Sequence, residues 1–253
     1  MPGAEALKKT VADDAREPSS FDDLGSRFCK PEAVEEARAF AHGVTASAGC
    51  DGSHDWNHIC RVHKNVQEIA REENLSDAKL RLVEVIALLH DVADSKYAGH
   101  EERGRALNDF LLSQVKRGRM SAVDLEVVRF VLERMSFKDE SKGSCEGVVL
   151  PIELKVVQDA DRLDAIGAVG IARCFMFGGS KGSSLIEWGD PKDEKTTDKG
   201  IAYKSCVGHF YEKLLKLKTM MKTKAGAALA ERRHQVMVDF LSQIEEECNT
   251  RFD

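Results

Sequence analysis

Residues 80–91 read LRLVEVIALLHD, an apolar run that ends in a histidine and an aspartate. The apolar residues recur at the spacing of a helix, and the inward stripe that they form continues into His90 and Asp91. The preceding residues 74–76, Asn-Leu-Ser, provide the end of one helix and the cap of the next. This stretch therefore predicts a buried helix that carries an ionisable pair at its end.

The same helical spacing extends on both sides of this run. The chain has 253 residues with only five prolines, and helix-forming residues dominate the pattern. Besides residues 80–91, helices are expected over residues 31–44, 58–69, 100–116, 121–135, 152–177, 203–222 and 225–249. The sequence shows no internal repeat and predicts an all-α protein, a helical bundle with a single domain.

The segment 152–177 is the least surface-like of these and is expected to run as one helix through the core. The Gly178-Gly179 pair is interpreted as its C-cap and hinge. The apolar residues of 178–200 show no helical or strand period, which predicts a flexible loop. Loops of this length are usually functional or disordered. Whether this loop closes as a lid is left open. Residues 1–28 are expected to form a disordered or weakly ordered tail, which leaves residues 29–253 as the domain.

Charge and cysteine content limit the partners and the compartment. The formal net charge is −6, which argues against nucleic acid as a partner but allows a small anionic ligand. Seven cysteines occur without a CxxC pair, and an odd number suits reduced thiols, so a cytoplasmic or nuclear location is expected. No apolar run approaches the length of a membrane span, so no membrane partner is expected.

Four ionisable side chains lie on predicted core helices, where such groups are out of place. They are His58, the pair His90 and Asp91, and Asp161. A buried carboxylate is costly unless a cation, a set of donors or a metal compensates it, and one shared metal ion would serve all four groups. Asp161 has small residues beside it on its helix, so it is the acid with space for a ligand.

Three blocks around these residues resemble those of a known family. Residues 54–62 read HDWNHICRV, residues 87–96 read ALLHDVADSK, and residues 158–167 read QDADRLDAIG. Their histidines and aspartates resemble the H…HD…D signature of the HD superfamily of metal-dependent phosphohydrolases, and the blocks look like those of its YpgQ/YedJ branch. The likeness runs from about residue 30 to the C-terminal helix.

This resemblance implies an α-helical HD domain that binds one divalent cation through His58, His90, Asp91 and Asp161. Mn²⁺ or Mg²⁺ is implied first, with Fe²⁺, Zn²⁺, Ni²⁺ and Co²⁺ as alternatives. Two imidazoles and two carboxylates form a mixed nitrogen and oxygen site, and an octahedron then keeps two positions for water and a phosphate oxygen. The implied reaction cleaves a nucleoside triphosphate between its α and β phosphates.

Asp94 is the candidate catalytic residue, because a carboxylate just after the His-Asp pair could orient or deprotonate the attacking water. A plain turn residue or helix cap is the open alternative for Asp94. Related branches place an acidic pair here, whereas this chain has Ala93 as the first member. That departure argues against a guanosine tetraphosphate hydrolase.

The candidate substrate-binding residues lie in or near the three blocks. Lys96, Arg61 and Arg173 are expected within reach of phosphate oxygens, and the alternative for each is a solvated or ion-paired side chain. His54 is expected at the start of its helix near the substrate, and Asp164 is a further candidate contact.

Several alternatives remain open. His54 and His58 have the spacing of two zinc ligands in HExxH proteases, but an aspartate replaces the glutamate base. A phosphomonoesterase of the 5′-nucleotidase type and a non-catalytic nucleotide sensor are the alternative functions. The remaining apolar stripe is interpreted as core or as the seam of a homodimer, and it comprises Phe210, Leu214, Leu217 and Met221.

Overall fold

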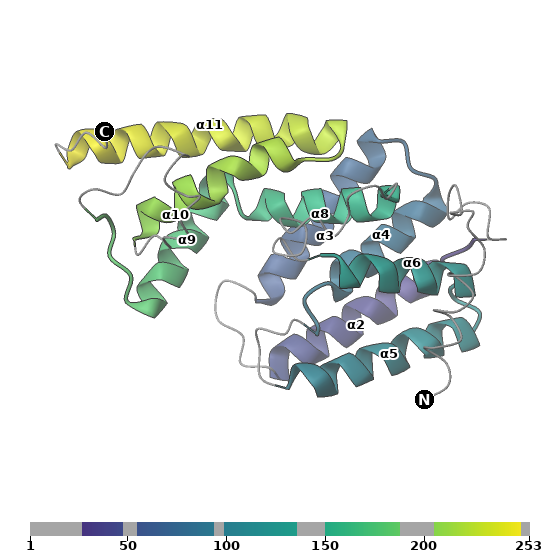
Figure 1. Cartoon of the computed structure of the whole chain (residues 1–253). Coiled ribbons are helices and arrows are strands. Elements are labelled where there is room, and N and C mark those ends of the chain that lie inside the picture. Colours follow the sequence, from purple (N-terminus) through teal and green to yellow (C-terminus); the bar gives the residue numbers. More distant parts are fainter. Residues whose placement is uncertain (1–26, 48–54, 94–98, 136–149, 188–204, 249–253) are drawn as a thin grey trace, which may run out of the picture.

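The structure, a computed structural model, describes residues 27–47, 55–93, 99–135, 150–187 and 205–248. Helices make up almost all of these residues (Figure 1). They are α2 (Pro31–Ser47), α3 (Trp56–Glu72), α4 (Asp77–Leu89), α5 (His100–Lys116), α6 (Ala122–Glu133), α8 (Ile152–Asp164), α9 (Gly167–Lys181), α10 (Cys206–Glu212), the 3-10 helix η3 (Leu214–Met220) and α11 (Lys224–Glu247). Within the described ranges, β pairing is limited to two isolated bridges, so the predicted all-α fold is confirmed.

Helix α4 occupies the centre of the fold. Every residue from Leu82 to Leu89 is buried, because α2, α3, α6 and α8 all pack against this helix. The sequence predicted one inward stripe, whereas the structure encloses the whole second half of the helix. The chain leaves this enclosed segment at His90, so the ionisable pair emerges directly from the core.

Helix α3 lies between α4 and α8 and begins at a well-defined cap. The carboxylate of Asp55 accepts a hydrogen bond from the backbone N–H of His58 at 2.9 Å, which satisfies a donor of the first turn. Ser76 caps α4 in the same way through the backbone N–H of Lys79. The cap at Ser76 was predicted from the sequence.

The expected single helix over residues 152–177 is wrong, because the chain bends between α8 and α9 by 66°. Gly167 has a φ of +75°, a conformation that is costly for residues with a Cβ. A Cβ on Gly170 would lie 2.2 Å from the carbonyl oxygen of Ala165. The two glycines therefore permit a sharp turn inside a sequence that is apolar enough to continue as a helix.

Two further boundaries also differ from the prediction. Gly178 lies inside α9, where a Cβ would meet the Sγ of Cys206, and the C-cap is Gly182, with a φ of +70°. The helix expected over residues 203–222 is divided into α10 and η3. The loop expected beyond the glycine pair falls largely on residues 188–204, which lie outside the described residues.

The late apolar stripe contributes to the core of the chain itself. Phe210, Leu214 and Leu217 are buried, and the ring of Phe210 packs near those of Phe175 and Phe240 on α9 and α11. In Figure 1, α9 and α10 lie beside one end of α8, and α11 runs along the top of the view.

Arg27 and Phe28, which the sequence assigned to the N-terminal tail of residues 1–28, belong to the fold. The guanidinium of Arg27 donates to Asp124 at 2.9 Å and to Glu153 at 2.7 Å. The two acceptor side chains are only 3% and 2% exposed. The backbone N–H of Phe28 also donates to Asp124. Arg27 and Phe28 therefore attach the segment before α2 to α6 and α8.

Among the helices described, no single one is long and apolar enough to cross a membrane. The bent pair α8 and α9 passes the same criterion only when the two are counted together.

Candidate metal centre

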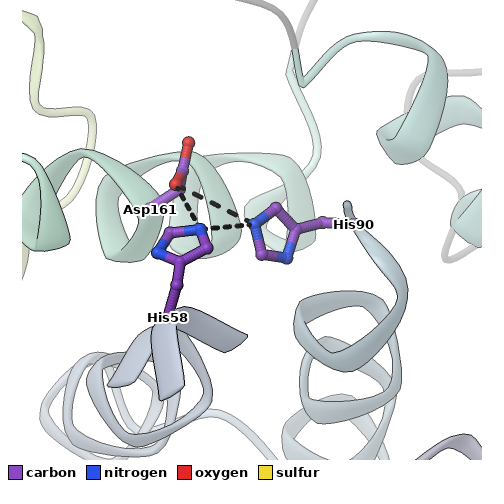
Figure 2. A group of neighbouring side chains, drawn as sticks. All are labelled: His58, His90 and Asp161. Carbon is purple, nitrogen blue, oxygen red and sulfur yellow. Dashed lines mark hydrogen bonds and ion pairs between the residues drawn. The ribbon is translucent and has the colours of Figure 1, made fainter. Parts of the chain in front are cut away.

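Three helices bring four ionisable side chains to one point beside the end of α4. His58 comes from the first turn of α3, His90 and Asp91 follow the end of α4, and Asp161 projects from α8. Figure 2 shows His58, His90 and Asp161 pointing toward one another. Residues separated by up to about a hundred positions in the sequence thus face a common centre.

The ligand atoms are separated by short distances. Nε2 of His58 lies 3.3 Å from Nε2 of His90, 3.2 Å from Oδ2 of Asp91 and 3.5 Å from Oδ1 of Asp161. Nε2 of His90 lies 3.4 Å from Oδ1 of Asp91 and 3.9 Å from Oδ1 of Asp161. Two ligand atoms that share an ion at right angles lie about 3 Å apart, so these separations are close to those of a coordinated set.

The other ring nitrogen of each histidine, Nδ1, forms a hydrogen bond on the side that faces away from the centre. Nδ1 of His58 donates to Oδ2 of Asp164 at 2.7 Å, and Nδ1 of His90 donates to the carbonyl oxygen of Ala87 at 2.7 Å. A neutral imidazole with a proton on Nδ1 carries its lone pair on Nε2. Both histidines are therefore arranged to present Nε2 to the centre.

This arrangement fits a divalent cation. Two imidazole nitrogens and the oxygens of two carboxylates converge, and each of these atoms is an electron-pair donor once the histidines are neutral. Such atoms repel one another unless a positive charge lies among them. In the part of the chain that the structure describes, His58, His90 and Asp161 are the one group of this kind whose ligand atoms all lie within 4.8 Å of one another.

The surrounding charges affect the protonation of His58. Burial disfavours its imidazolium, but hydrogen bonds with Asp164 and Asp91 and the charge of Asp161 outweigh burial and raise the pKa of His58 to about 9. Burial alone would raise the pKa of Asp164. The hydrogen bonds from His58 and Arg61 instead hold the pKa of this carboxyl well below its ordinary value. In the free protein near neutral pH, a proton on His58 thus supplies the positive charge.

Binding of Mn²⁺ is expected to weaken by about tenfold for each pH unit below 9, because the proton on His58 must leave before Nε2 can bind an ion. Above the pKa of about 9 the affinity should stop rising with pH. Calorimetry between about pH 6 and 8, in buffers of different ionisation enthalpy, measures both this slope and the proton released. A pH-independent affinity over that range would contradict the prediction.

The three acids of α8 have different surroundings. Asp161 has 37% of its side chain exposed and faces the centre, in agreement with the expectation that it has space before it. Asp159 is buried and accepts from the backbone N–H groups of Lys222 and Thr223 at the start of α11. Asp164 is buried beneath His58.

The expected substrate contact of Asp164 is corrected by this position. Its carboxylate is 2% exposed and accepts from His58, Arg61 and Arg173. Arg61 and Arg173 are therefore ion-paired, which is the alternative that the sequence left open for both. Arg61 still has 36% of its side chain exposed, whereas Arg173 has 14%.

Other predicted site residues cannot be placed in the same way. His54, Asp94 and Lys96 lie outside the described residues. The neighbouring His63 is buried between α2 and α4, where its ring lies 3.3 Å from Glu84. It contributes to packing and not to the centre.

Two supporting contacts were not predicted. Asn65 of α3 donates to the carbonyl oxygen of Ala160 on α8 at 3.0 Å and accepts from Arg233 of α11, which fixes the crossing that carries His58 and Asp161. Arg103 of α5 donates to the carbonyl oxygen of Val92, next to Asp91, at 2.9 Å. Neither contact leaves a signal in the sequence, because each depends on how separate helices cross.

Comparison with known proteins agrees with this geometry. Residues 55–166, which include all four candidate ligands, match the HD domain family. Over 214 residues the chain is 40% identical to YpgQ of Bacillus subtilis (strain 168), in a match that covers 85% of this chain and 93% of YpgQ. The chain belongs to the HD superfamily of metal-dependent phosphohydrolases.

Solved structures place the HD fold over most of the chain. A Lactobacillus plantarum protein matches with a TM-score of 0.70 at 29% identity, over 88% of this chain and 99% of that protein. B. subtilis YpgQ in complex with ADP matches with a TM-score of 0.64 at 35% identity, over 85% and 97%. An HD-superfamily hydrolase from Bacillus thuringiensis matches with a TM-score of 0.62 at 33% identity, over 87% and 98%.

Proposed function

We propose that this HD-type hydrolase cleaves a nucleoside triphosphate to the monophosphate and pyrophosphate with the help of one divalent cation. The observation that carries the proposal is the convergence of Nε2 of His58 and His90 with the carboxylates of Asp91 and Asp161. A nucleotide as substrate is supported by the ADP bound to B. subtilis YpgQ. Phosphate oxygens are also the ligands that an open position on such an ion favours.

His58, His90, Asp91 and Asp161 would hold the ion, and the resemblance to the HD superfamily favours Mn²⁺ or Mg²⁺, while the mixed donor set also suits Fe²⁺ and Zn²⁺. When bound, such an ion polarises the phosphoryl group and lowers the pKa of a water molecule. The histidines contribute through orientation, because their Nδ1 protons are already bonded elsewhere. The two carboxylates contribute negative charge, which balances the charge of the ion.

We assign proton transfer and phosphate binding to residues of the HD-type sequence blocks. Asp94, three positions after Asp91 in the sequence, is proposed to accept the proton of the attacking water at its carboxylate. Lys96 and the exposed side of Arg61 are proposed to contact phosphate oxygens. Arg61 can do so while bonded to Asp164, because about a third of its side chain remains exposed.

The products of a nucleotide panel test this function. Metal-stripped protein is mixed with Mn²⁺ and each of the common ribo- and deoxyribonucleoside mono- and triphosphates, and the release of pyrophosphate and orthophosphate is measured separately. We expect pyrophosphate and a nucleoside monophosphate from triphosphates, and no orthophosphate from monophosphates. A protein treated with chelator and given no metal is the control and should release neither.

Two other results would overturn the proposal. Orthophosphate released from monophosphates would indicate a phosphomonoesterase of the 5′-nucleotidase type. Saturable binding of nucleotides without turnover, with each divalent metal supplied in turn, would indicate a nucleotide sensor that keeps the HD fold.

A further inference from the structure

The contact between Asp164 and His58 is made inside the protein and not at its surface. Nδ1 of His58 donates to Oδ2 of Asp164 at 2.7 Å, and the two side chains are 1% and 2% exposed. A substrate that approaches the centre meets Asp161, which has more than a third of its side chain exposed. Asp164 is therefore reached from the centre only through the imidazole ring.

The carboxylate of Asp164 is fixed from two sides by arginines on different helices. Arg61 of α3 donates from Nε to Oδ1 at 2.7 Å and from a terminal nitrogen to Oδ2 at 3.1 Å. Arg173 of α9 donates to Oδ2 at 2.9 Å and to the backbone carbonyl oxygen of Asp164 at 3.1 Å. These donors stabilise the buried charge and leave the carboxylate little freedom to turn.

The direction of the hydrogen bond determines what His58 can offer to an ion. An ionised carboxylate only accepts hydrogen bonds, so the imidazole must keep its proton on Nδ1. When a metal ion takes the place of the second proton, Nε2 is then the nitrogen with a lone pair. The carboxylate thus selects the tautomer and holds the plane of the ring.

We propose that Asp164, held by Arg61 and Arg173, is a positioning residue that acts through His58 to set the affinity of the metal centre. This inference rests on the metal centre of the proposed function, but it does not depend on which phosphorylated compound is the substrate. It gives Asp164 and Arg173 a role different from substrate contact, and it gives Arg61 a second role beside phosphate binding.

Asp164→Asn is the sharpest variant, because the side chain keeps its shape. The Oδ2 position accepts from Nδ1 of His58, from Arg61 and from Arg173, so the amide oxygen is expected there and the NH₂ group meets the Nε donor of Arg61. The variant therefore loses the negative charge behind the ring and the contact that fixes the side chain against Arg61, which weakens the bond that holds Nδ1 and the plane of the ring. We expect the Mn²⁺ affinity to fall by about 10- to 100-fold, the range for loss of a partner behind a metal-binding histidine.

A matched control is available in the same core. Glu84 is a buried carboxylate that also contacts a histidine, His63, at 3.3 Å, but His63 is not part of the centre. Glu84→Gln should change thermal stability to a similar degree and leave the Mn²⁺ affinity unchanged. An equal loss of affinity in both variants would show that general core damage is responsible, and would overturn the proposal.

Two further measurements separate positioning from contact with substrate. In ¹⁵N NMR of the Zn²⁺-loaded protein, the Nδ1 proton of His58 should give a slowly exchanging signal, and Asp164→Asn should make that exchange faster. In nucleotide turnover, the variant should regain kcat as Mn²⁺ is raised. A low kcat at every Mn²⁺ concentration, or an Nδ1 proton that exchanges as slowly in the variant as in the wild type, would overturn the positioning role.

These readouts also distinguish failure of this inference from failure of the proposed function. If the wild type turned over no nucleotide, the Mn²⁺ affinities and the NMR signal of His58 would still decide whether Asp164 sets the metal centre. If nucleotides were cleaved but Asp164→Asn bound Mn²⁺ as tightly as the wild type, only the inference would fail.

Discussion

Replacing Asp161 with alanine is expected to reduce metal-dependent turnover by about 10³-fold or more, with little change in thermal stability. The Oδ1 atom of Asp161 lies 3.5 Å from Nε2 of His58 and 3.9 Å from Nε2 of His90, so the variant loses a charged ligand of the centre. Ion-assisted charge stabilisation is worth several kcal/mol, and each 1.4 kcal/mol corresponds to about a factor of ten in rate. Turnover with Mn²⁺ and calorimetric titration of Mn²⁺ measure the two parts of this effect.

Thermal stability should change little because the Asp161 side chain is 37% exposed and lies close to another carboxylate. Asp161→Asn removes the negative charge of the side chain but keeps its shape. This variant should also lose most of the metal-dependent turnover. Asp239→Ala on α11 removes an exposed acid that accepts only locally, from Gln235, and should behave as the wild type. Normal turnover in Asp161→Ala would remove this residue from the centre.

Replacing Arg27 with alanine is expected to lower the free energy of unfolding by about 3–5 kcal/mol. The side chain of Arg27 is only 12% exposed and donates to Asp124 and Glu153, so its removal leaves two buried carboxylates without their shared cation. Urea denaturation of the wild type and the variant measures the loss, and turnover per folded molecule should remain unchanged.

A more exposed arginine on α6 provides the matched control. Arg129 pairs with Glu126 at 2.8 Å, with side chains 35% and 47% exposed, and Arg129→Ala should cost only about 0.3–0.5 kcal/mol. Adding Asp124→Asn to Arg27→Ala should recover part of the lost stability, because one unpaired charge is then removed. If Arg27→Ala lowered the free energy of unfolding no more than Arg129→Ala does, residues 27 and 28 would not be anchored to the fold, and the prediction would be wrong.

Local patterns predicted the helices that begin with clear caps. The start of α4 was visible as Ser76 ahead of an apolar stripe, and its side chain accepts the expected backbone hydrogen bond. Helices α2, α5, α6 and α11 also lie where the helical period indicated. These features depend on residues within a few positions of one another, which is the information that a single sequence carries.

The bend between α8 and α9 was missed because it does not disturb the apolar pattern. Gly167 and Gly170 are small enough to pass for helix residues between apolar neighbours, and their spacing was the one available signal of a break. The division of α10 from η3 was missed for a similar reason, since Leu214 and Leu217 continue the apolar stripe.

At the centre, the sequence indicated which residues to bring together but not how they are supported. His58, His90, Asp91 and Asp161 were selected from ionisable groups in apolar helices and from the HD-type blocks, and the structure places them side by side. The position of Asp164 under His58 depends on the crossing of α3 over α8. Such a crossing is a property of packed helices, and periodicity within one helix does not contain it.

The bend at Gly167 also determines which residues can reach Asp164 behind His58. In a straight helix, residues 164 and 173 would lie about 13 Å apart along the axis at 1.5 Å per residue, beyond the reach of one arginine. Because the chain turns by 66°, the guanidinium of Arg173 instead bonds to Asp164 at 2.9 Å. Gly167 and Gly170 offer no side chain to the centre, but the turn that they permit brings Arg173 to the carboxylate behind His58.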